Sequence, residues 1–94
     1  MMTEQACRDI VLARMAQDPR FVAANFQDIT LIAKTGNTFL VAARTPEGRV
    51  VQARAVSVRG LDHEALEQVA RDMVGILIEG GRQNFDRDLA GHDL

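Results

Sequence analysis

Several residue types that often carry chemistry or stabilise small proteins are scarce in this chain of 94 residues. It has no tryptophan, no tyrosine, four phenylalanines and a single cysteine, Cys7. One cysteine excludes an internal disulfide and is too few for a typical cysteine-rich zinc site. The core must therefore be built mainly from aliphatic side chains and methionine, which a chain of this length can do as one domain.

Signals for membranes and export are missing as well. No apolar run approaches the ~20 residues that cross a bilayer. The start of the chain, Met1 to Gln5, has no basic segment followed by an apolar stretch, so we expect no secretory signal. Together with the unpaired cysteine, this favours a cytoplasmic protein.

Residues of catalytic or ligand-binding type are few and scattered. The single serine, Ser57, lies in a predicted strand, and neither His63 nor His92 has a second metal ligand at a suitable spacing. Cys7 falls on the apolar stripe of a predicted helix, where burial is expected rather than nucleophilic catalysis. The glycines mark turns and follow neither phosphate-loop nor dinucleotide-binding spacing. We therefore expect no enzyme, no cofactor and no metal.

What the chain does contain is a run of three predicted strands between Ile29 and Arg59. In the tighter turn, Pro46 suits the first central position of a type I turn and Gly48 the left-handed position that follows. This geometry pairs Thr45 with Arg49. Counting outward, it predicts three apolar pairs, Ala43 with Val51, Val41 with Ala53, and Phe39 with Ala55.

The other turn, at residues 35–37, supports the same arrangement. Its Gly36 and Asn37 tolerate left-handed backbone, so Lys34 can pair with Thr38. The pairs that follow are Ala33 with Phe39, Leu31 with Val41, and Ile29 with Ala43. Because side chains alternate with period two, both hairpins place their apolar residues on one shared face of an antiparallel meander.

The opposite face of this meander mixes polar and apolar side chains, although a solvated face is normally more polar. The residues expected there are Thr30, Ile32, Lys34, Thr38, Leu40, Arg44, Val50, Gln52, Arg54, Val56 and Val58. Two interpretations stay open. The apolar residues are either scattered surface positions, which are common, or a patch with a basic rim that contacts a partner.

A helix is expected before the meander. Thr3 suits its N-cap and the helix should run to about Gln17. Its inward face, at helical spacing, comprises Ala6, Cys7, Ile10, Val11 and Met15. The pair Asp18-Pro19 then favours a short extra helical turn near 19–25, with Phe21 and Val22 facing inward.

The helix after the meander has the stronger signature. Asp62 suits the N-cap, Leu61 and Leu66 form a hydrophobic staple, and Gly80 ends the helix. The inward stripe comprises Leu66, Val69, Ala70, Met73, Ile76 and Leu77. Val74 and Ile78 widen the apolar arc beyond what a surface helix needs. Either the first helix packs against this flank, which is the default, or another subunit does.

Together these elements predict an α+β fold in the order helix, three-stranded antiparallel meander, helix, with both helices packed on one face of the sheet. Residues 1–82 form the single domain. Residues 83–94 form a polar tail, in which Phe85 and Leu89 either dock on the core or fray with the rest. Residues 1–60 carry eight Lys/Arg against five Asp/Glu, and residues 61–94 carry three against eight. The sheet is therefore basic and the C-terminal part acidic.

The first functional hypothesis is a small non-catalytic protein-interaction domain, acting as an adaptor, regulator or inhibitor. It would form a homodimer or bind another protein through the outer sheet face or the flank of the second helix. The partner-binding residues would be Ile32, Lys34, Leu40, Arg44, Gln52, Arg54, Val56, Val74 and Ile78.

The alternative is a nucleic-acid-binding module with a basic sheet face. It would use Lys34, Arg44, Arg54 and Arg59 to hold phosphates. Against it, the second helix begins with Asp62 and Glu64, which would repel phosphates, and the outer face lacks aromatic residues on which bases could stack. We therefore favour a protein partner.

Overall fold

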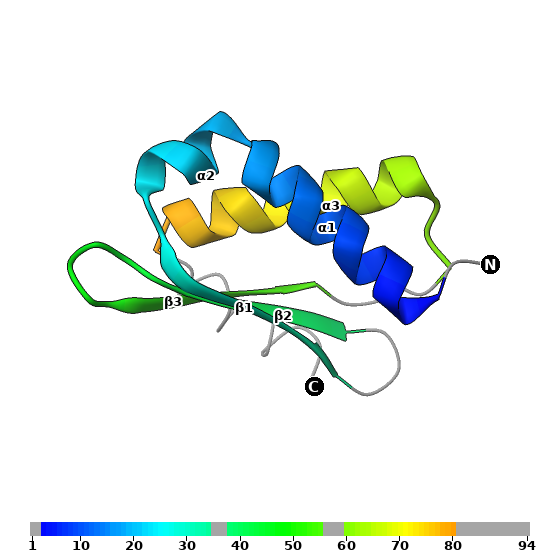
Figure 1. The fold of residues 1–94 in the computed structure, drawn as a ribbon, viewed down its shortest axis with the longest axis horizontal. Coiled ribbons are helices and arrows are strands. Elements are labelled where there is room, and N and C mark those ends of the chain that lie inside the picture. Colours follow the sequence, from blue (N-terminus) through cyan, green and yellow to red (C-terminus); the bar gives the residue numbers. More distant parts are fainter. Residues whose placement is uncertain (1–2, 35–37, 56–59, 81–94) are drawn as a thin grey trace.

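The fold has two layers, with helices over one face of an antiparallel sheet (Figure 1). The computed structural model describes residues 3–34, 38–55 and 60–80, and within them the sheet has the strand order β1-β2-β3. The elements are α1 (Glu4–Gln17), α2 (Pro19–Ala24), β1 (Gln27–Lys34), β2 (Thr38–Arg44), β3 (Val50–Ala55) and α3 (His63–Ile78). The predicted α+β order is confirmed, with α1 and α3 on one face of the sheet and α2 as the short extra helix.

Side-chain caps begin both long helices at the predicted residues. The Thr3 hydroxyl accepts a hydrogen bond from the backbone N–H of Ala6 at 3.1 Å, and an Asp62 carboxylate oxygen accepts from that of Ala65 at 2.8 Å. Each bond satisfies one of the free N–H groups of a first helical turn. The helix starts were therefore correctly predicted from local chemistry.

The β2–β3 hairpin has the predicted turn and register. The backbone N–H of Thr45 donates to the Arg49 carbonyl at 2.7 Å, and that of Gly48 donates to the Thr45 carbonyl at 2.8 Å. Gly48 has φ +89°, the left-handed conformation that this turn requires. The apolar pairs are Phe39 with Ala55, Val41 with Ala53 and Ala43 with Val51, as predicted.

The β1–β2 hairpin agrees with the prediction only in part. Leu31 pairs with Val41 and Ala33 with Phe39, as expected. Nearer the start of β1 the register shifts, so that residues 27–30 lie opposite residues 42–44. The predicted pairing of Ile29 with the buried Ala43 is therefore wrong, and Ile29 is exposed.

The cause of this shift is a β-bulge in β1. Asp28 adopts φ +53°, a left-handed conformation that Asp tolerates better than most residues, and one extra residue is inserted on this strand. Asp28 also accepts a hydrogen bond from Nε of Arg44 at 3.1 Å. This ion pair joins the bulge to the neighbouring strand.

One hydrophobic core lies between the helices and the inner face of the sheet. The buried apolar residues are Cys7, Val11, Met15, Phe21, Leu31, Phe39, Val41, Ala43, Val51, Ala53, Leu66, Ala70, Met73, Val74 and Leu77. The radius of gyration is 12.6 Å, close to the value of about 12 Å expected for a compact domain of this length. In the described part of the chain, no helix combines the length and apolarity needed to cross a bilayer.

Helix α3 is rotated relative to its predicted inward stripe. Val74 is fully buried, whereas Val69 and Ile76 are only partly buried. The reason is that α1 packs along α3, so the buried arc of α3 extends toward α1 as well as toward the sheet. Val74 on this flank is therefore buried within the chain itself and needs no second subunit to cover it, while Ile78 remains 43% exposed.

Helix α2 buries only one of its two predicted inward residues. Phe21 lies in the core and its ring centroid is 5.4 Å from that of Phe26. Val22 is 64% exposed, so its predicted inward position is wrong. A helix of six residues with a neighbour on one side buries one narrow face.

Candidate interaction surface

Chemical groups of the described residues do not converge on a reactive site. Among residues 3–34, 38–55 and 60–80, no three His, Cys, Asp or Glu side chains lie close enough to hold a metal ion. Cys7 is buried in the core, whereas His63 is exposed and lies 3.5 Å from Glu67 on the same helix. Ser57, Arg59 and His92 fall outside the described residues.

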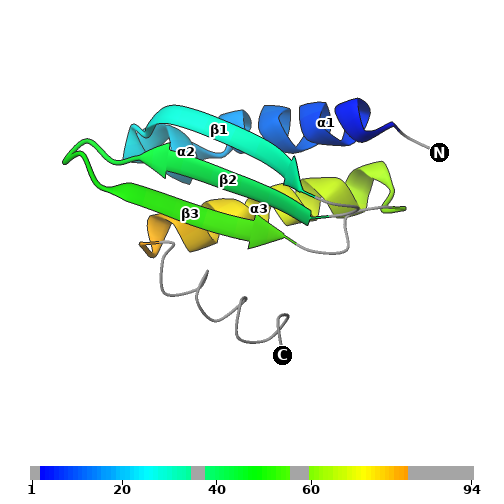
Figure 2. The ribbon, with the colours of Figure 1, turned by 90° about the horizontal axis from the view of Figure 1, so that it is seen from below.

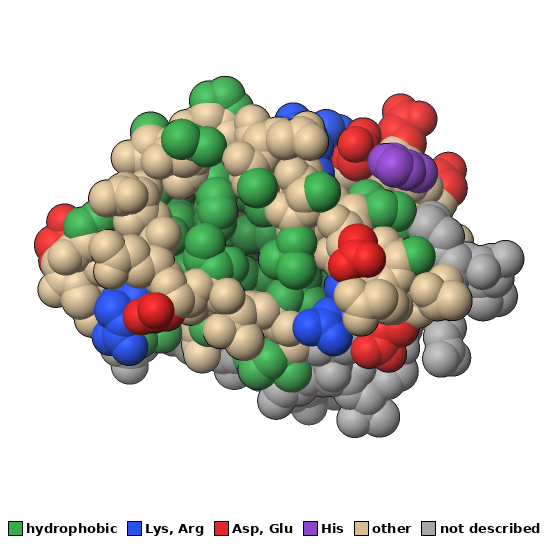
Figure 3. Space-filling view, in the orientation of Figure 1, with side chains coloured by type: hydrophobic (Ala, Val, Ile, Leu, Met, Phe, Trp, Pro, Cys, Tyr) green, Lys and Arg blue, Asp and Glu red, His purple; other side chains and the backbone are tan. Residues whose placement is uncertain are grey.

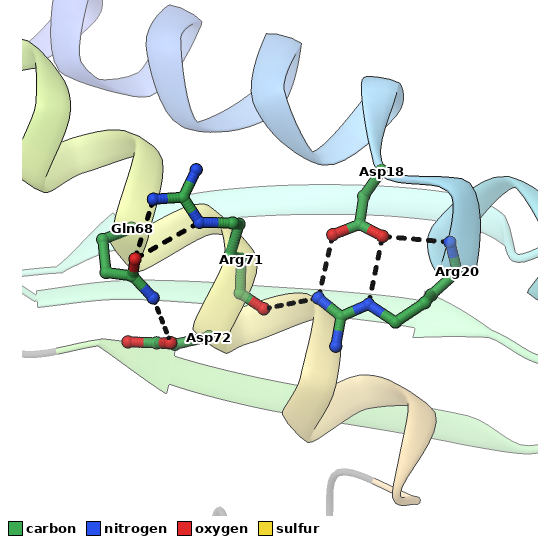
Figure 4. A network of polar contacts seen from close by, with 5 residues as sticks. All are labelled: Asp18, Arg20, Gln68, Arg71 and Asp72. Carbon is green, nitrogen blue, oxygen red and sulfur yellow. Dashed lines mark hydrogen bonds and ion pairs between the residues drawn. The ribbon is translucent and has the colours of Figure 1, made fainter.

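The most perturbed ionisable group, Asp18, is fully engaged in holding helices together (Figure 4). One carboxylate oxygen accepts from the backbone N–H and Nε of Arg20, at 2.9 and 3.1 Å, and the other accepts from Nη2 at 2.9 Å. Nη2 also donates to the Arg71 carbonyl on α3, at 3.2 Å. The hydrogen bonds from Arg20 lower the pKa of Asp18 to about 2, although burial opposes the shift. The carboxylate thus holds the Arg20 guanidinium that ties α2 to α3, and its low pKa makes it poorly suited to act as a base.

The described helices leave the outer face of the sheet uncovered. Seen from the sheet side in Figure 2, the three strands lie in front and α1–α3 lie behind them. Cross-strand pairing arranges the outward residues in three rows, Ile32–Leu40–Arg54, Thr30–Ala42–Gln52 and Arg44–Val50. Most of the predicted partner-binding residues of the sheet are thus brought together on one face.

Aliphatic side chains form a diagonal stripe across these rows. Ile32 is 45% exposed and Val50 is 51% exposed, while Leu40 and Ala42 between them are partly exposed. We call these four residues the outer band. Contiguous apolar patches on a surface mark interaction sites, whereas single exposed aliphatic residues are common on folded proteins.

Arginines lie at both ends of the outer band. Arg54 is paired across the strands with Leu40, and Arg44 with Val50. The Arg44 side chain is about half exposed, and its guanidinium donates to the Asp28 carboxylate at 3.1 Å and to the Gly48 carbonyl at 3.3 Å. The side chain of Lys34 and all of Val56 fall outside what the structure describes.

The flank of α3 contributes less than predicted. Val74 was among the predicted partner-binding residues, but it is fully buried in the core and cannot contact a partner in this fold. Ile78 keeps its exposure, and the exposed Val22 on α2 is an apolar residue that the sequence placed in the core. No continuous apolar surface on α3 therefore follows from these residues.

A second apolar area was not predicted at all. Figure 3 shows a hollow lined with hydrophobic side chains, between α1 and α2 on one side and the edge of β1 on the other. The core residues that keep the most exposure come from these same elements, Cys7 and Phe21 at 8% and Leu31 at 5%.

Arg8 connects α1 to the edge of β1. Its Nη2 donates to the Leu31 carbonyl at 3.1 Å, and its buried Nε has no hydrogen-bond partner among the described residues. The contact occupies one backbone acceptor at an edge strand, which limits unwanted strand pairing there.

Known proteins give no further guide to this surface. Comparison of the chain with protein-family models, curated proteins and solved structures found no match. The function therefore has to be argued from the outer face and its charges.

Proposed function

We propose that this protein is a small non-catalytic interaction domain, acting in the cytoplasm as an adaptor, regulator or inhibitor. It binds a protein partner or a second copy of itself through the outer face of the sheet. The observation that carries the proposal is the outer band, because α1 and α3 both cover the other face and leave Ile32 and Val50 about half exposed. Burying these side chains against a partner would release apolar surface from water.

The charges on this face favour an acidic partner. Arg44 and Arg54 adjoin the outer band, and Arg44 already binds a carboxylate, that of Asp28. Such rim charges contribute mainly to the rate and orientation of binding, while the apolar contact supplies most of the affinity. A partner segment with aliphatic residues between carboxylates fits this surface best.

A nucleic-acid partner has less support. Phe21 and Phe39 are buried and Phe26 is partly buried, so the described aromatic residues offer no exposed ring for base stacking. The alternative is best tested directly, by retention on DNA and RNA at low salt.

The central experiment removes apolar area from the outer band while keeping the strands. The double variant Ile32→Thr/Leu40→Thr does this, since Thr is β-branched and favours strands. Light scattering at rising concentration measures self-association, and capture from host-cell extract with mass spectrometry measures binding to other proteins. We expect the wild type to bind itself or a specific protein and the double variant to lose that binding.

Val22→Ala is the matched control, because it removes an exposed aliphatic residue from α2 and leaves the sheet intact. It should bind as the wild type does, and circular dichroism should show all three proteins folded. The proposal would be refuted if the wild type stays monomeric and captures the same proteins as the double variant.

A further inference from the structure

We infer that the free edge of β1 takes an extended segment of a partner protein as a further strand, and that a carboxylate of this segment binds Arg8. The segment has aliphatic residues at alternate positions and one Asp or Glu in phase with them. This surface is separate from the outer band, so the inference goes beyond the proposed function and stands or falls independently of it.

The edge of β1 that faces away from β2 carries backbone groups with which no strand of the described residues pairs. Hydrogen-bonding direction alternates along antiparallel strands. Because Thr45 bonds to Arg49 across the β2–β3 turn, counting back through β2 to β1 directs Leu31 and Ala33 to this free edge. The bond from Arg8 of α1 to the Leu31 carbonyl agrees with this phase. An extended segment can therefore pair with these groups as an added strand.

Apolar side chains beside this edge are incompletely covered. Leu12 lies one turn after Arg8, on the face of α1 that reaches β1, and is only partly buried. Phe26, directly before β1, is also partly buried, and its ring contacts that of Phe21. Figure 3 shows hydrophobic side chains in the hollow between α1, α2 and β1. Since side chains of a strand alternate between its two sides, every second residue of an added strand would face this hollow.

Arg8 supplies the charge that selects a carboxylate. Among the described residues, none offers a carboxylate within ion-pair distance of its guanidinium. Its Nη2 donates only to the neutral Leu31 carbonyl, and its Nε is buried without an acceptor, which is energetically costly. Nε and Nη2 form one edge of the guanidinium, which can bind both oxygens of a carboxylate.

A second copy of β1 fits this edge less well. The one acidic residue of β1, Asp28, already accepts a hydrogen bond from Arg44, and the other charged residue of the strand, Lys34, is basic. Two paired β1 edges would each bring an Arg8 and no free carboxylate, and like charges oppose association. The unpaired charge of Arg8 therefore favours a different segment, one that brings its own carboxylate.

Binding would exchange the partners of Arg8. Because Nε is covered in the unbound fold, Arg8 has to turn away from Leu31 before a carboxylate can reach both nitrogens. The Leu31 carbonyl that it releases can then accept a backbone N–H from the added strand. Arg8 thus keeps the edge closed to strands that lack a carboxylate and yields to one that has it.

Random decapeptides displayed on phage and selected on the full chain test the inference without a known partner. We expect enriched sequences with aliphatic residues at alternate positions and an Asp or Glu in the same phase. The best sequence is then made as a labelled peptide and titrated by fluorescence anisotropy. N-methylation of the amides that pair with β1 should weaken its binding about tenfold or more.

A comparison of charges tests the role of Arg8. Replacing the acidic residue of the peptide by its amide should weaken binding to the wild type about tenfold, and binding to Arg8→Met less than about twofold. Met keeps a long unbranched side chain, and circular dichroism should show the variant folded. The peptide changes measured on the wild type do not depend on the folding of any variant.

The outer-band variant Ile32→Thr/Leu40→Thr separates this edge from the proposed function, because it should bind the peptide as the wild type does. Loss of peptide binding in that variant would overturn the inference. So would a selection without enriched sequences, binding that N-methylation leaves unchanged, or an equal charge effect in the wild type and Arg8→Met. Self-association that Arg8→Met strengthens, with no peptide selected, would assign the edge to a second copy and overturn it as well.

Discussion

Val74 and Ile78 lie one turn apart on α3 and should respond to truncation very differently. The sequence assigned both to one apolar flank, but Val74 is fully buried and Ile78 is 43% exposed. Substituting each by alanine therefore tests whether α1, rather than a second subunit, covers this flank. The outcome decides which part of α3 is available to a partner.

The expected costs follow from the atoms removed. Val74→Ala deletes two buried methyl groups, about 1.6 kcal/mol at ~0.8 kcal/mol each. The cavity left behind adds up to about 1 kcal/mol, and the better helix propensity of Ala returns about 0.5 kcal/mol. The net loss is about 2 kcal/mol, or a fall of roughly 10 °C in Tm for a domain of this size. For Ile78→Ala the smaller loss of burial nearly cancels the gain in propensity, leaving a change under about 0.5 kcal/mol.

Urea unfolding of both variants and the wild type, each at two protein concentrations, measures these differences. The unfolding free energy should not depend on concentration if Val74 is covered within one chain. A Val74→Ala loss no larger than that of Ile78→Ala would refute the packing of α1 on this flank. A loss that appears only at high concentration would assign the flank to a subunit interface instead.

Two further predictions concern the helix junction and the β2–β3 turn. The pKa of Asp18 is about 2 in the fold against 3.8 ordinarily, so its ion pair with Arg20 stabilises the protein fully above pH ~4 and loses this effect as the pH falls toward ~2. Asp18→Asn, which keeps a capping side chain, should destabilise at pH 7 but approach the wild type in urea unfolding at pH ~2; a pH-independent difference would contradict the assignment. Gly48→Ala should cost about 1 kcal/mol in thermal unfolding because φ is +89°, although no atom lies within 4 Å of the added Cβ. A loss near zero would mean that the turn relaxes to another type.

The register was predictable because its determinants are local. Pro46 and Gly48 select one turn type, and the period of two then fixes every partner along β2 and β3. The prediction failed at Ile29 because a bulge lies at Asp28. The left-handed backbone of Asp28 and the bond from Arg44 to its carboxylate arise only when the strands are paired. A single Asp in a strand carries no distinct signal of this kind.

Helix packing was less accessible from sequence. The wide apolar arc of α3 correctly indicated a second contact, but the arc does not say which residues of the flank that contact covers, so Val74 was also named as a partner-binding residue. The hollow beside β1 depends on how α1 rises away from the sheet beyond the bond from Arg8 to Leu31 (Figure 1). Such angles follow from tertiary packing and leave no periodic pattern in the chain.

The outer band needs an explanation beyond strand formation. Ile32 and Val50 are β-branched, so high strand propensity could by itself account for aliphatic side chains at these positions. Leu40 is not β-branched, yet it occupies the outer face of the central strand. The same strands carry Thr30 and Thr38 at outward positions, and Thr combines strand propensity with a polar group suited to water. At those positions the chain combines high strand propensity with a polar side chain. The aliphatic residues of the outer band are therefore better explained by contact with an apolar surface.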